Sequence, residues 1–347
     1  MMKNLLLCSL LALSAWGQKF QVPLKGEWLD TALDLAAGST LKVAVTGDLP
    51  AAGTQKGFKD LLKTFPVNEA GRGAVVGRIG DAAAARPFLI GDSLDRRVPV
   101  AGRLFLGANL PAGESPAGTG SFEVTVTVVK GAPAPKLNLD QLPKLTQQQL
   151  DQVPNRVVDA EGTPGDRVNF AIIGAEKRIV DLLKAGGWVR VNRNKSEAAM
   201  GMVLSVLNRR GYVELPMSEL LMFDRVQDYG FALGDPVKNV ASRHHFRLWK
   251  APFTARGQEV WIGAGTHDVG FDKDQRNGKL THRIDEDTDK EREFIGESLK
   301  ASGEVAQTYY LTHRNPVTRT KTAHGQEFFS DGRTLIIVLA PEAVAPQ

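Results

Sequence analysis

Apolar and polar residues alternate along several short segments in the first third of the chain. From Phe122 to Val128, every second residue is apolar, and the residues between are glutamate or threonine. Segments 41–46 and 103–107 have the same period. A period of two with β-branched residues predicts strands with one buried and one solvated face. Glycine-rich connections separate these segments, so we expect residues 18–130 to form an all-β sandwich.

The pattern is mixed in the second half of the chain. The apolar run 168–174 predicts a strand, whereas residues 176–186 have helical spacing. A second helix is expected at 196–208, with Ser196 as its N-cap, and a third at 289–301. The order of these elements predicts that residues 166–340 form an α+β domain with a mostly antiparallel sheet and about three helices.

Further strands are expected in this second domain near residues 244–249, 260–265 and 280–284. A last hairpin is predicted between residues 327–329 and 334–339. Its turn would be Ser330-Asp331-Gly332, because Asp-Gly between apolar runs is a strong turn signal.

Prolines and a Gln-rich run mark residues 131–165, which we interpret as a linker between the domains, with one short helix. Residues 341–347 form a short tail. The first seventeen residues have the pattern of a signal peptide: Lys3, an eleven-residue apolar run from Leu5 to Ala15, and small residues before a cleavage point after Gly17. We therefore expect export to the periplasm, the cell envelope or the medium, and a retained N-terminal anchor is the alternative.

The expected export and the composition exclude several kinds of catalytic and binding site. Cys8 is the only cysteine, so cleavage after residue 17 leaves no disulfide and no thiolate nucleophile. No later stretch has the length of a transmembrane helix. The net charge of +4 and the pI near 9.1 come from basic residues dispersed among nearly as many acids, so a nucleic-acid partner is not expected.

All six histidines lie in the second domain, and three of them have polar neighbours. Residues two apart on a strand share a face, so His245 lies beside Arg247. If the strands are neighbours, one pocket would contain His245, Arg247, His267, Asp268, His282 and Asp285. The three histidines would bind a divalent metal or exchange protons, the aspartates would orient them, and the arginine would hold an anionic group. The alternative is a structural hydrogen-bonded network with an acidic helix cap, since no established catalytic motif is present.

The second domain resembles the LssY C-terminal domain family between about residues 167 and 339. The similarity is carried by ordered blocks: VNFAIIG from Val168, AGGW from Ala185, LMFDRVQDY from Leu221, RHHFRLW from Arg243, VWIGAGTHD from Val260, LTHRID from Leu280 and DKER from Asp289. Where the family often has Thr-His-His-Ile, Arg283 replaces the second histidine. The family has no settled activity, but it is often fused to membrane domains resembling phosphatidic acid phosphatases, which implies envelope lipids or phosphorylated substrates.

The first domain is similar to the calcium-dependent galactophilic lectin family, a galactose-binding-like sandwich. The similarity lies in GAVVGRIG from Gly73, PFLIG from Pro87, GRLFLGAN from Gly102 and GTGSF from Gly118. It implies a calcium ion that holds sugar hydroxyls, with Asn109 and Glu114 as ligands. Calcium prefers six to eight oxygen ligands, and the loop of residues 108–119 offers few.

Two functions follow from these observations. The first is an exported binding protein for glycan or another envelope component. This function is favoured, and the alternative is a hydrolase of phosphoester or lipid-derived envelope substrates that uses the His, Asp and Arg residues of the second domain.

Overall fold

The computed structural model describes residues 17–60, 63–116, 120–131, 137–191, 217–233 and 242–341. The predicted signal peptide, apart from Gly17, and the predicted helix at 196–208 lie outside these residues. Within the described part of the chain, no helix has both the length and the apolar character needed to cross a membrane.

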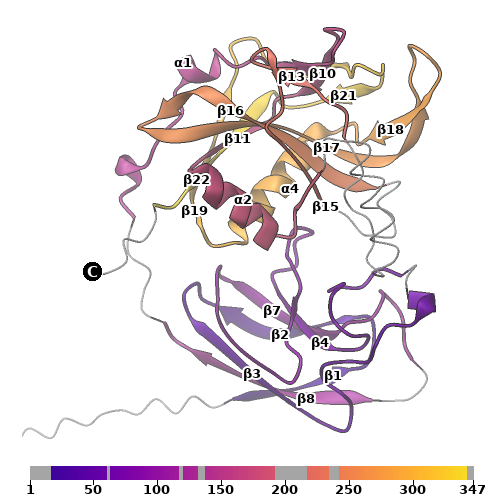
Figure 1. The fold of residues 1–347 in the computed structure, drawn as a ribbon. Coiled ribbons are helices and arrows are strands. Elements are labelled where there is room, and N and C mark those ends of the chain that lie inside the picture. The colour runs from indigo at the N-terminus through magenta and orange to yellow at the C-terminus, as the bar shows by residue number, and fades with distance from the viewer. Residues whose placement is uncertain are drawn as a thin grey trace, which may run out of the picture.

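The N-terminal lobe (residues 18–131) is built from two four-stranded antiparallel sheets (Figure 1). One has the order β1-β8-β3-β6 and the other β2-β7-β4-β5. The strands are β1 (Gln18–Pro23), β2 (Trp28–Leu35), β3 (Thr40–Thr46), β4 (Val75–Ile79), β5 (Phe88–Leu89), β6 (Ser93–Arg97), β7 (Gly102–Ala108) and β8 (Ser121–Val129), with a 3-10 turn at Phe58–Asp60.

Alternation along the strands produces the core of this lobe. On β8, Phe122, Val124 and Val126 are buried, and they pack in one cluster with Leu104 and Leu106 of β7 in the other sheet. The intervening positions of β8 are more exposed. The all-β architecture expected from the alternation is therefore confirmed.

The C-terminal lobe (residues 137–341) contains a twisted central sheet of the order β12-β15-β16-β17-β11-β22-β19, with β18 paired to β17 (Figure 1). All neighbours are antiparallel except β11 and β22. The strands are β11 (Phe170–Ile173), β12 (Val189–Arg190), β15 (Tyr229–Leu233), β16 (Arg243–Ala255), β17 (Gln258–Lys273), β18 (Leu280–Ile284), β19 (Val305–Thr312) and β22 (Arg333–Leu339).

Smaller elements cover the two faces of the central sheet. Apolar residues of α2 (Glu176–Ala185) and α4 (Thr288–Lys300) are buried on one face. The other face packs against α1 (Gln147–Leu150) and a small sheet. The remaining strands are β9 (Arg156–Val158), β10 (Pro164–Arg167), β13 (Leu221–Met222) and β14 (Arg225–Val226), which form that small sheet, and the pair β20 (Arg319–Lys321) and β21 (Glu327–Phe329); a 3-10 turn lies at Leu139–Gln141.

The long hairpin of β16 and β17 is the structural centre of this lobe. Its two-residue turn is Arg256-Gly257, and both residues have positive φ angles, of 45° and 77°. Such turns match the twist of paired strands. A shift of register between Lys250 and Thr254 then sets which residues face one another at the far end of the hairpin, where the histidines lie.

Several sequence expectations are confirmed and two differ. The helices at 176–186 and 289–301 are present as α2 and α4. The predicted hairpin of 327–329 with 334–339 is wrong, since β21 pairs with β20 while β22 pairs with β11 and β19. The side chain of Ser330 hydrogen-bonds Asp289, and Asp331 pairs with Arg292, so the turn is attached to α4.

Part of the predicted linker is built into the C-terminal lobe. Leu142, Leu145, Leu150, Val153 and Val157 are all buried in its core. Burial of these apolar side chains stabilises the packed segment, although prolines lie between them. The segment therefore packs against the lobe instead of forming a free connection between the lobes.

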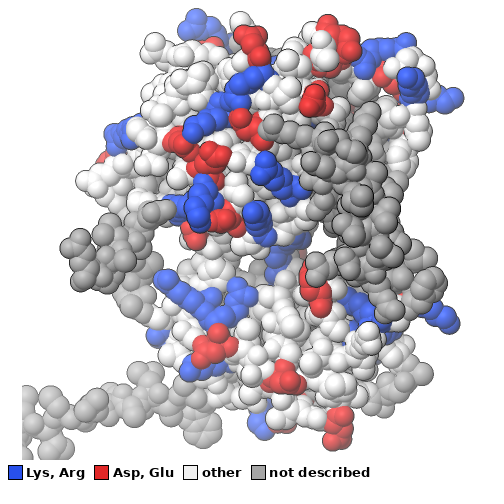
Figure 2. Space-filling view, in the orientation of Figure 1, with Lys and Arg blue, Asp and Glu red and all other residues white. Residues whose placement is uncertain are grey.

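The two lobes are in contact. Arg86 of the N-terminal lobe donates from Nε to the carbonyl of Gly186, which follows α2, over 2.7 Å. Gly187 next to it has no Cβ, and a Cβ there would collide with the guanidinium. The space-filling view shows a groove between the lobes with basic and acidic side chains along it (Figure 2).

Candidate functional site

The register of β16 and β17 places the histidines on two opposite faces of the sheet. His244 is paired with His267, and its neighbour His245 is paired with Thr266. Successive side chains on a strand point to opposite faces, so these two pairs point away from each other. Two separate polar clusters result.

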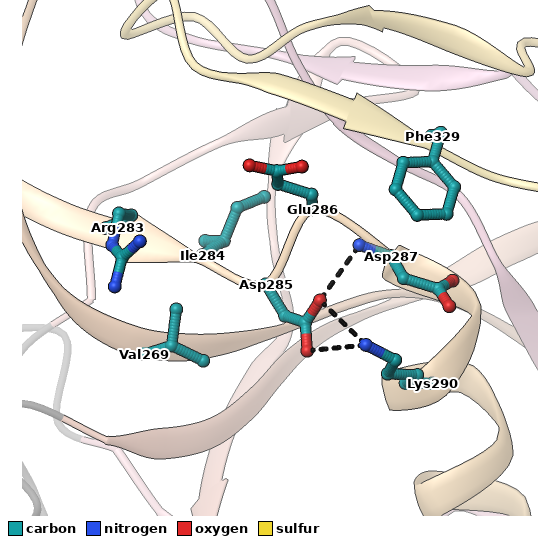
Figure 3. A pocket seen from close by; sticks show the side chains of 8 residues that line it. All are labelled: Val269, Arg283, Ile284, Asp285, Glu286, Asp287, Lys290 and Phe329. Carbon is teal, nitrogen blue, oxygen red and sulfur yellow. Dashed lines mark hydrogen bonds and ion pairs between the residues drawn. The ribbon is translucent and has the colours of Figure 1, made fainter.

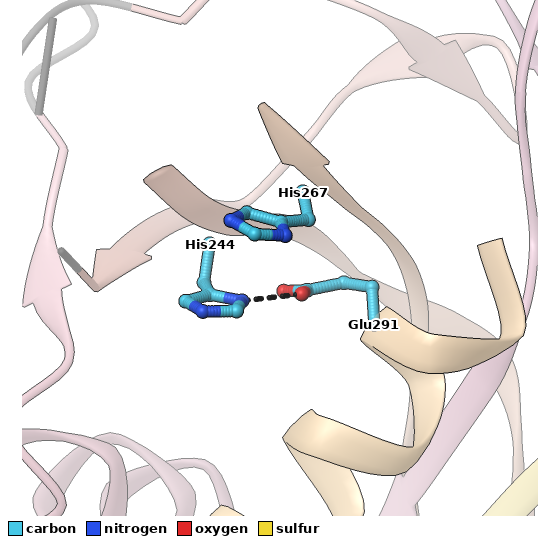
Figure 4. A group of neighbouring side chains, drawn as sticks. All are labelled: His244, His267 and Glu291. Carbon is cyan, nitrogen blue, oxygen red and sulfur yellow. Dashed lines mark hydrogen bonds and ion pairs between the residues drawn. The ribbon is translucent and has the colours of Figure 1, made fainter. Parts of the chain in front are cut away.

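The first, which we call the helix-side cluster, consists of His244, His267 and Glu291 (Figure 4). The ring of His244 is stacked between His267, at 4.0 Å between ring centroids, and Phe294 of α4, at 3.7 Å. Its Nδ1 lies 2.6 Å from Oε2 of Glu291. The Nε2 atom of His267 lies 3.2 Å from the Ser242 hydroxyl.

Burial keeps the helix-side cluster uncharged. Glu291 is 2% exposed, and burial raises the pKa of its carboxyl well above the usual value, with further increases from the charges of Asp268 and Asp285. Burial also lowers the pKa of His244 to about 3, and it lowers the pKa of His267. These directions favour a neutral pair in which the Glu291 carboxyl holds the proton that bridges to Nδ1 of His244. Its other oxygen, Oε1, is buried without a hydrogen-bond partner among the described residues.

A cavity of about 520 Å³ opens onto the helix-side cluster. It lies between the lobes, because Ala82 to Ala84 of the N-terminal lobe form part of its wall. The first turns of α4 contribute carboxylates, among them Asp289 and Glu293, and both of these pair with Arg292. The positive end of the helix dipole favours acids at this position.

A second cavity of about 320 Å³ adjoins the first and shares Asp285, Asp287 and Lys290 with it (Figure 3). The Asp285 carboxylate lies 3.3 Å from Nζ of Lys290 and accepts the backbone N–H of Asp287. Asp287 in turn caps α4 by accepting the backbone N–H of Asp289.

The other polar group, which we call the interior cluster, surrounds Asp268 on the opposite face of the sheet. Oδ2 of Asp268 lies 3.4 Å from Nη2 of Arg243, 3.5 Å from Nδ1 of His245 and 3.6 Å from Nδ1 of His282. Burial raises the pKa of Asp268 to about 7, although the charges of Arg243 and Arg247 oppose the increase. Burial also lowers the pKa of both histidines.

The structure brings together part of the predicted site and separates the rest. His245, Asp268 and His282 meet in the interior cluster. Arg247 is near them on the same face, but it is held by Asp166 and by Ser218.

His267 and Asp285 line the cavity on the other side of the sheet. The predicted metal-binding trio His245, His267 and His282 is thus divided between the two faces. Among the described residues, one group of three histidine or acidic side chains offers ligand atoms within 4.8 Å of one another, and it is the helix-side cluster.

The sequence prediction did not include His244 and Glu291. His244 was available from the alternation along β16, since its face is opposite to that of His245. Glu291 had no such signal, because it lies on a helix 47 residues away and meets His244 only through the packing of α4 on the sheet.

The two residues predicted to bind calcium have structural partners in the N-terminal lobe. Asn109 is fully buried, accepts the Val67 N–H and donates to the carbonyls of Val67, Ala70 and Gly71. Glu114 pairs with Arg72 and Lys63. Both side chains are already engaged in these contacts, so the structure adds no support for the calcium-dependent route to glycan binding, which stays a prediction.

Comparison with protein-family models identifies a similarity. The family model described as LssY C-terminus matches residues 150–334, which is more than half of the chain and includes both polar clusters. No curated protein matches the chain. The N-terminal lobe lies outside the matched residues.

Proposed function

The chain belongs to the LssY C-terminus family, and we propose that the lobe covered by this family is a metal-dependent hydrolase of phosphoesters. Its divalent ion would bind at the helix-side cluster. One observation carries the proposal: the group of three potential metal ligands forms part of the wall of the 520 Å³ cavity between the lobes.

The chemistry of the three side chains fits a transition metal such as Zn²⁺. Two imidazoles and one carboxylate are a recurrent ligand set for catalytic zinc, which keeps its fourth position for water. Imidazole binds metals in its neutral form, and the low pKa values of His244 and His267 keep both rings neutral. The unpaired Oε1 of Glu291 provides a buried acceptor that a cation would satisfy.

Metal binding requires two adjustments in this cluster. Donor atoms on a tetrahedral ion with bonds of about 2.1 Å are about 3.4 Å apart, so the three groups must move closer and the stacked rings must turn. Glu291 must also lose its proton, because only the carboxylate is a ligand. Binding should therefore release a proton, and its affinity should rise with pH.

The bound ion would supply a nucleophile by lowering the pKa of its water, and it would bring positive charge into a cavity lined by acids. Asp285 belongs to the same wall and would be the candidate general base there. Phosphoesters are the first substrates to test, because the family is associated with membrane domains resembling phosphatidic acid phosphatases. Action in the cell envelope follows if the predicted signal peptide directs export.

Hydrolysis of bis(4-nitrophenyl) phosphate and of 4-nitrophenyl phosphate tests the proposal. The purified chain would be treated with a chelator and then supplied with Zn²⁺, Mn²⁺ or Co²⁺. His244→Ala, His267→Ala and Glu291→Gln should each reduce the metal-dependent rate by about 100-fold or more. Mutation of residues that only hydrogen-bond to metal ligands already reduces metal affinity or activity by about 10- to 100-fold.

Two other histidines provide comparisons. His324 lies outside both clusters, and His324→Asn should retain the wild-type rate. His282→Ala discriminates between the faces of the sheet. Loss of activity in that variant, with His244→Ala still active, would move the site to the interior cluster, and absence of any metal-dependent hydrolysis would reject the proposal.

A further inference from the structure

The hairpin of β17 and β18 extends beyond the body of the C-terminal lobe (Figure 1). Its register pairs Phe271 with His282 and Lys273 with Leu280, so these four side chains share one face. Leu280 is 74% exposed and Phe271 is 42% exposed. Two large apolar side chains on a projecting strand pair have no core to enter.

The connection at the end of this hairpin is held in one conformation by its own hydrogen bonds. The Asp274 carboxylate accepts from Arg276, Asn277 and His324. The side chain of Gln326 bonds to both the N–H and the carbonyl of Ile284 at the base. The exposed apolar residues are therefore presented by an ordered scaffold.

The charges on the hairpin are mainly basic. Lys273, Lys279 and Arg283 are exposed and form no ion pair with any residue that the structure describes. Arg276 is neutralised by Asp274 and Asp159, and Asp272 is the one exposed acid between residues 271 and 283. Figure 2 shows Lys and Arg side chains gathered at this end of the molecule.

We propose that this hairpin docks on a membrane surface that contains anionic phospholipid, with Leu280 and Phe271 entering the interface. Apolar side chains flanked by lysine and arginine are the combination that binds such surfaces, because burial and electrostatic attraction act together. A stable protein partner would need about 800 Å² of complementary surface, whereas two protruding side chains suit a soft lipid interface. This inference is independent of the proposed hydrolase activity.

Co-sedimentation with vesicles tests the proposal. The full chain would be mixed with vesicles of phosphatidylcholine alone and with vesicles of equal parts phosphatidylcholine and phosphatidylglycerol. We expect binding to the anionic vesicles that decreases with salt. Lys273→Gln and Lys279→Gln should each weaken binding by about 5-fold, and Leu280→Ser should weaken it by about tenfold.

The matched control is Leu89→Ser, which removes a leucine that is 45% exposed on the N-terminal lobe. It should bind as the wild type does. All variants carry the same N-terminal segment, so a contribution from its apolar run cancels in the comparison, and circular dichroism confirms folding. The proposal is overturned if the wild type does not bind anionic vesicles, if neutral vesicles bind it equally, or if Leu280→Ser and the lysine variants bind like Leu89→Ser.

Discussion

Replacement of His313 by glutamine should remove part of the acid sensitivity of the C-terminal lobe. His313 is 4% exposed, and its Nε2 has no hydrogen-bond partner among the described residues. Burial lowers the pKa of its imidazole to about 4, with a further decrease from the charge of Arg167 and a smaller opposing effect of Asp151. Arg167 is itself buried and keeps its charge at neutral pH, since its pKa is lowered only to about 10.

The size of the effect follows from the two protonation equilibria. The imidazole has a pKa of 6.5 in the unfolded chain and about 4 in the folded one. A depressed pKa contributes stability that is present above pH 6.5 and is lost as the pH falls through 4. A difference of about 2.5 in pKa corresponds to about 3 kcal/mol, because each pKa unit is worth about 1.4 kcal/mol.

Urea unfolding between pH 7 and pH 4, followed by tryptophan fluorescence, measures this contribution. The three tryptophans of the C-terminal lobe, Trp188, Trp249 and Trp261, are all buried. The wild type should lose about 3 kcal/mol more than His313→Gln over this range. His324→Gln, which replaces a histidine with a side chain that is 42% exposed, controls for the loss of an imidazole elsewhere in this lobe. Parallel curves for the wild type and His313→Gln would show that burial and Arg167 do not keep this imidazole neutral.

Three further predictions concern packing and metal ions. Gly263→Ala should lower the melting temperature and cost about 1–3 kcal/mol, because the new Cβ would stand 2.2 Å from the Phe170 ring; an unchanged melting temperature would contradict it. Asn109→Ala should destabilise the N-terminal lobe by about 2–3 kcal/mol in urea unfolding, since buried groups of the loop that includes Val67 lose their partners. Calcium should leave the melting temperature of the wild type unchanged, because Glu114 is engaged by basic side chains; a calcium-dependent increase would instead support the lectin-like site.

Local pattern predicted nine of the 22 described strands and the helices α2 and α4. The alternation from Phe122 to Val128 determines which face of β8 is buried. The predicted hairpin around Asp331 failed because its turn residues bond to α4, a contact between distant segments that no local pattern contains.

The candidate site shows the same limit. If residues of β16 and β17 are paired one by one from the turn at Arg256-Gly257, His244 lies on the correct face of the sheet. This regular pairing would, however, place His244 opposite Val269. The register shift near Lys250 moves the partner by two residues, to His267. The position of Glu291 depends in addition on how α4 packs against the sheet. The polar side chains of each strand were therefore predictable from the sequence, but the cluster that they form with the helix was not.

Titration of the metal-free protein with Co²⁺ or Zn²⁺ tests whether the helix-side cluster binds a metal ion. We expect one bound ion per chain, proton release on binding, and affinity that is lowered at least tenfold in His244→Ala and Glu291→Gln but unchanged in His324→Asn. The absence of binding, or equal binding by the wild type and Glu291→Gln, would show that the helix-side cluster is a structural hydrogen-bonded stack and not a metal site.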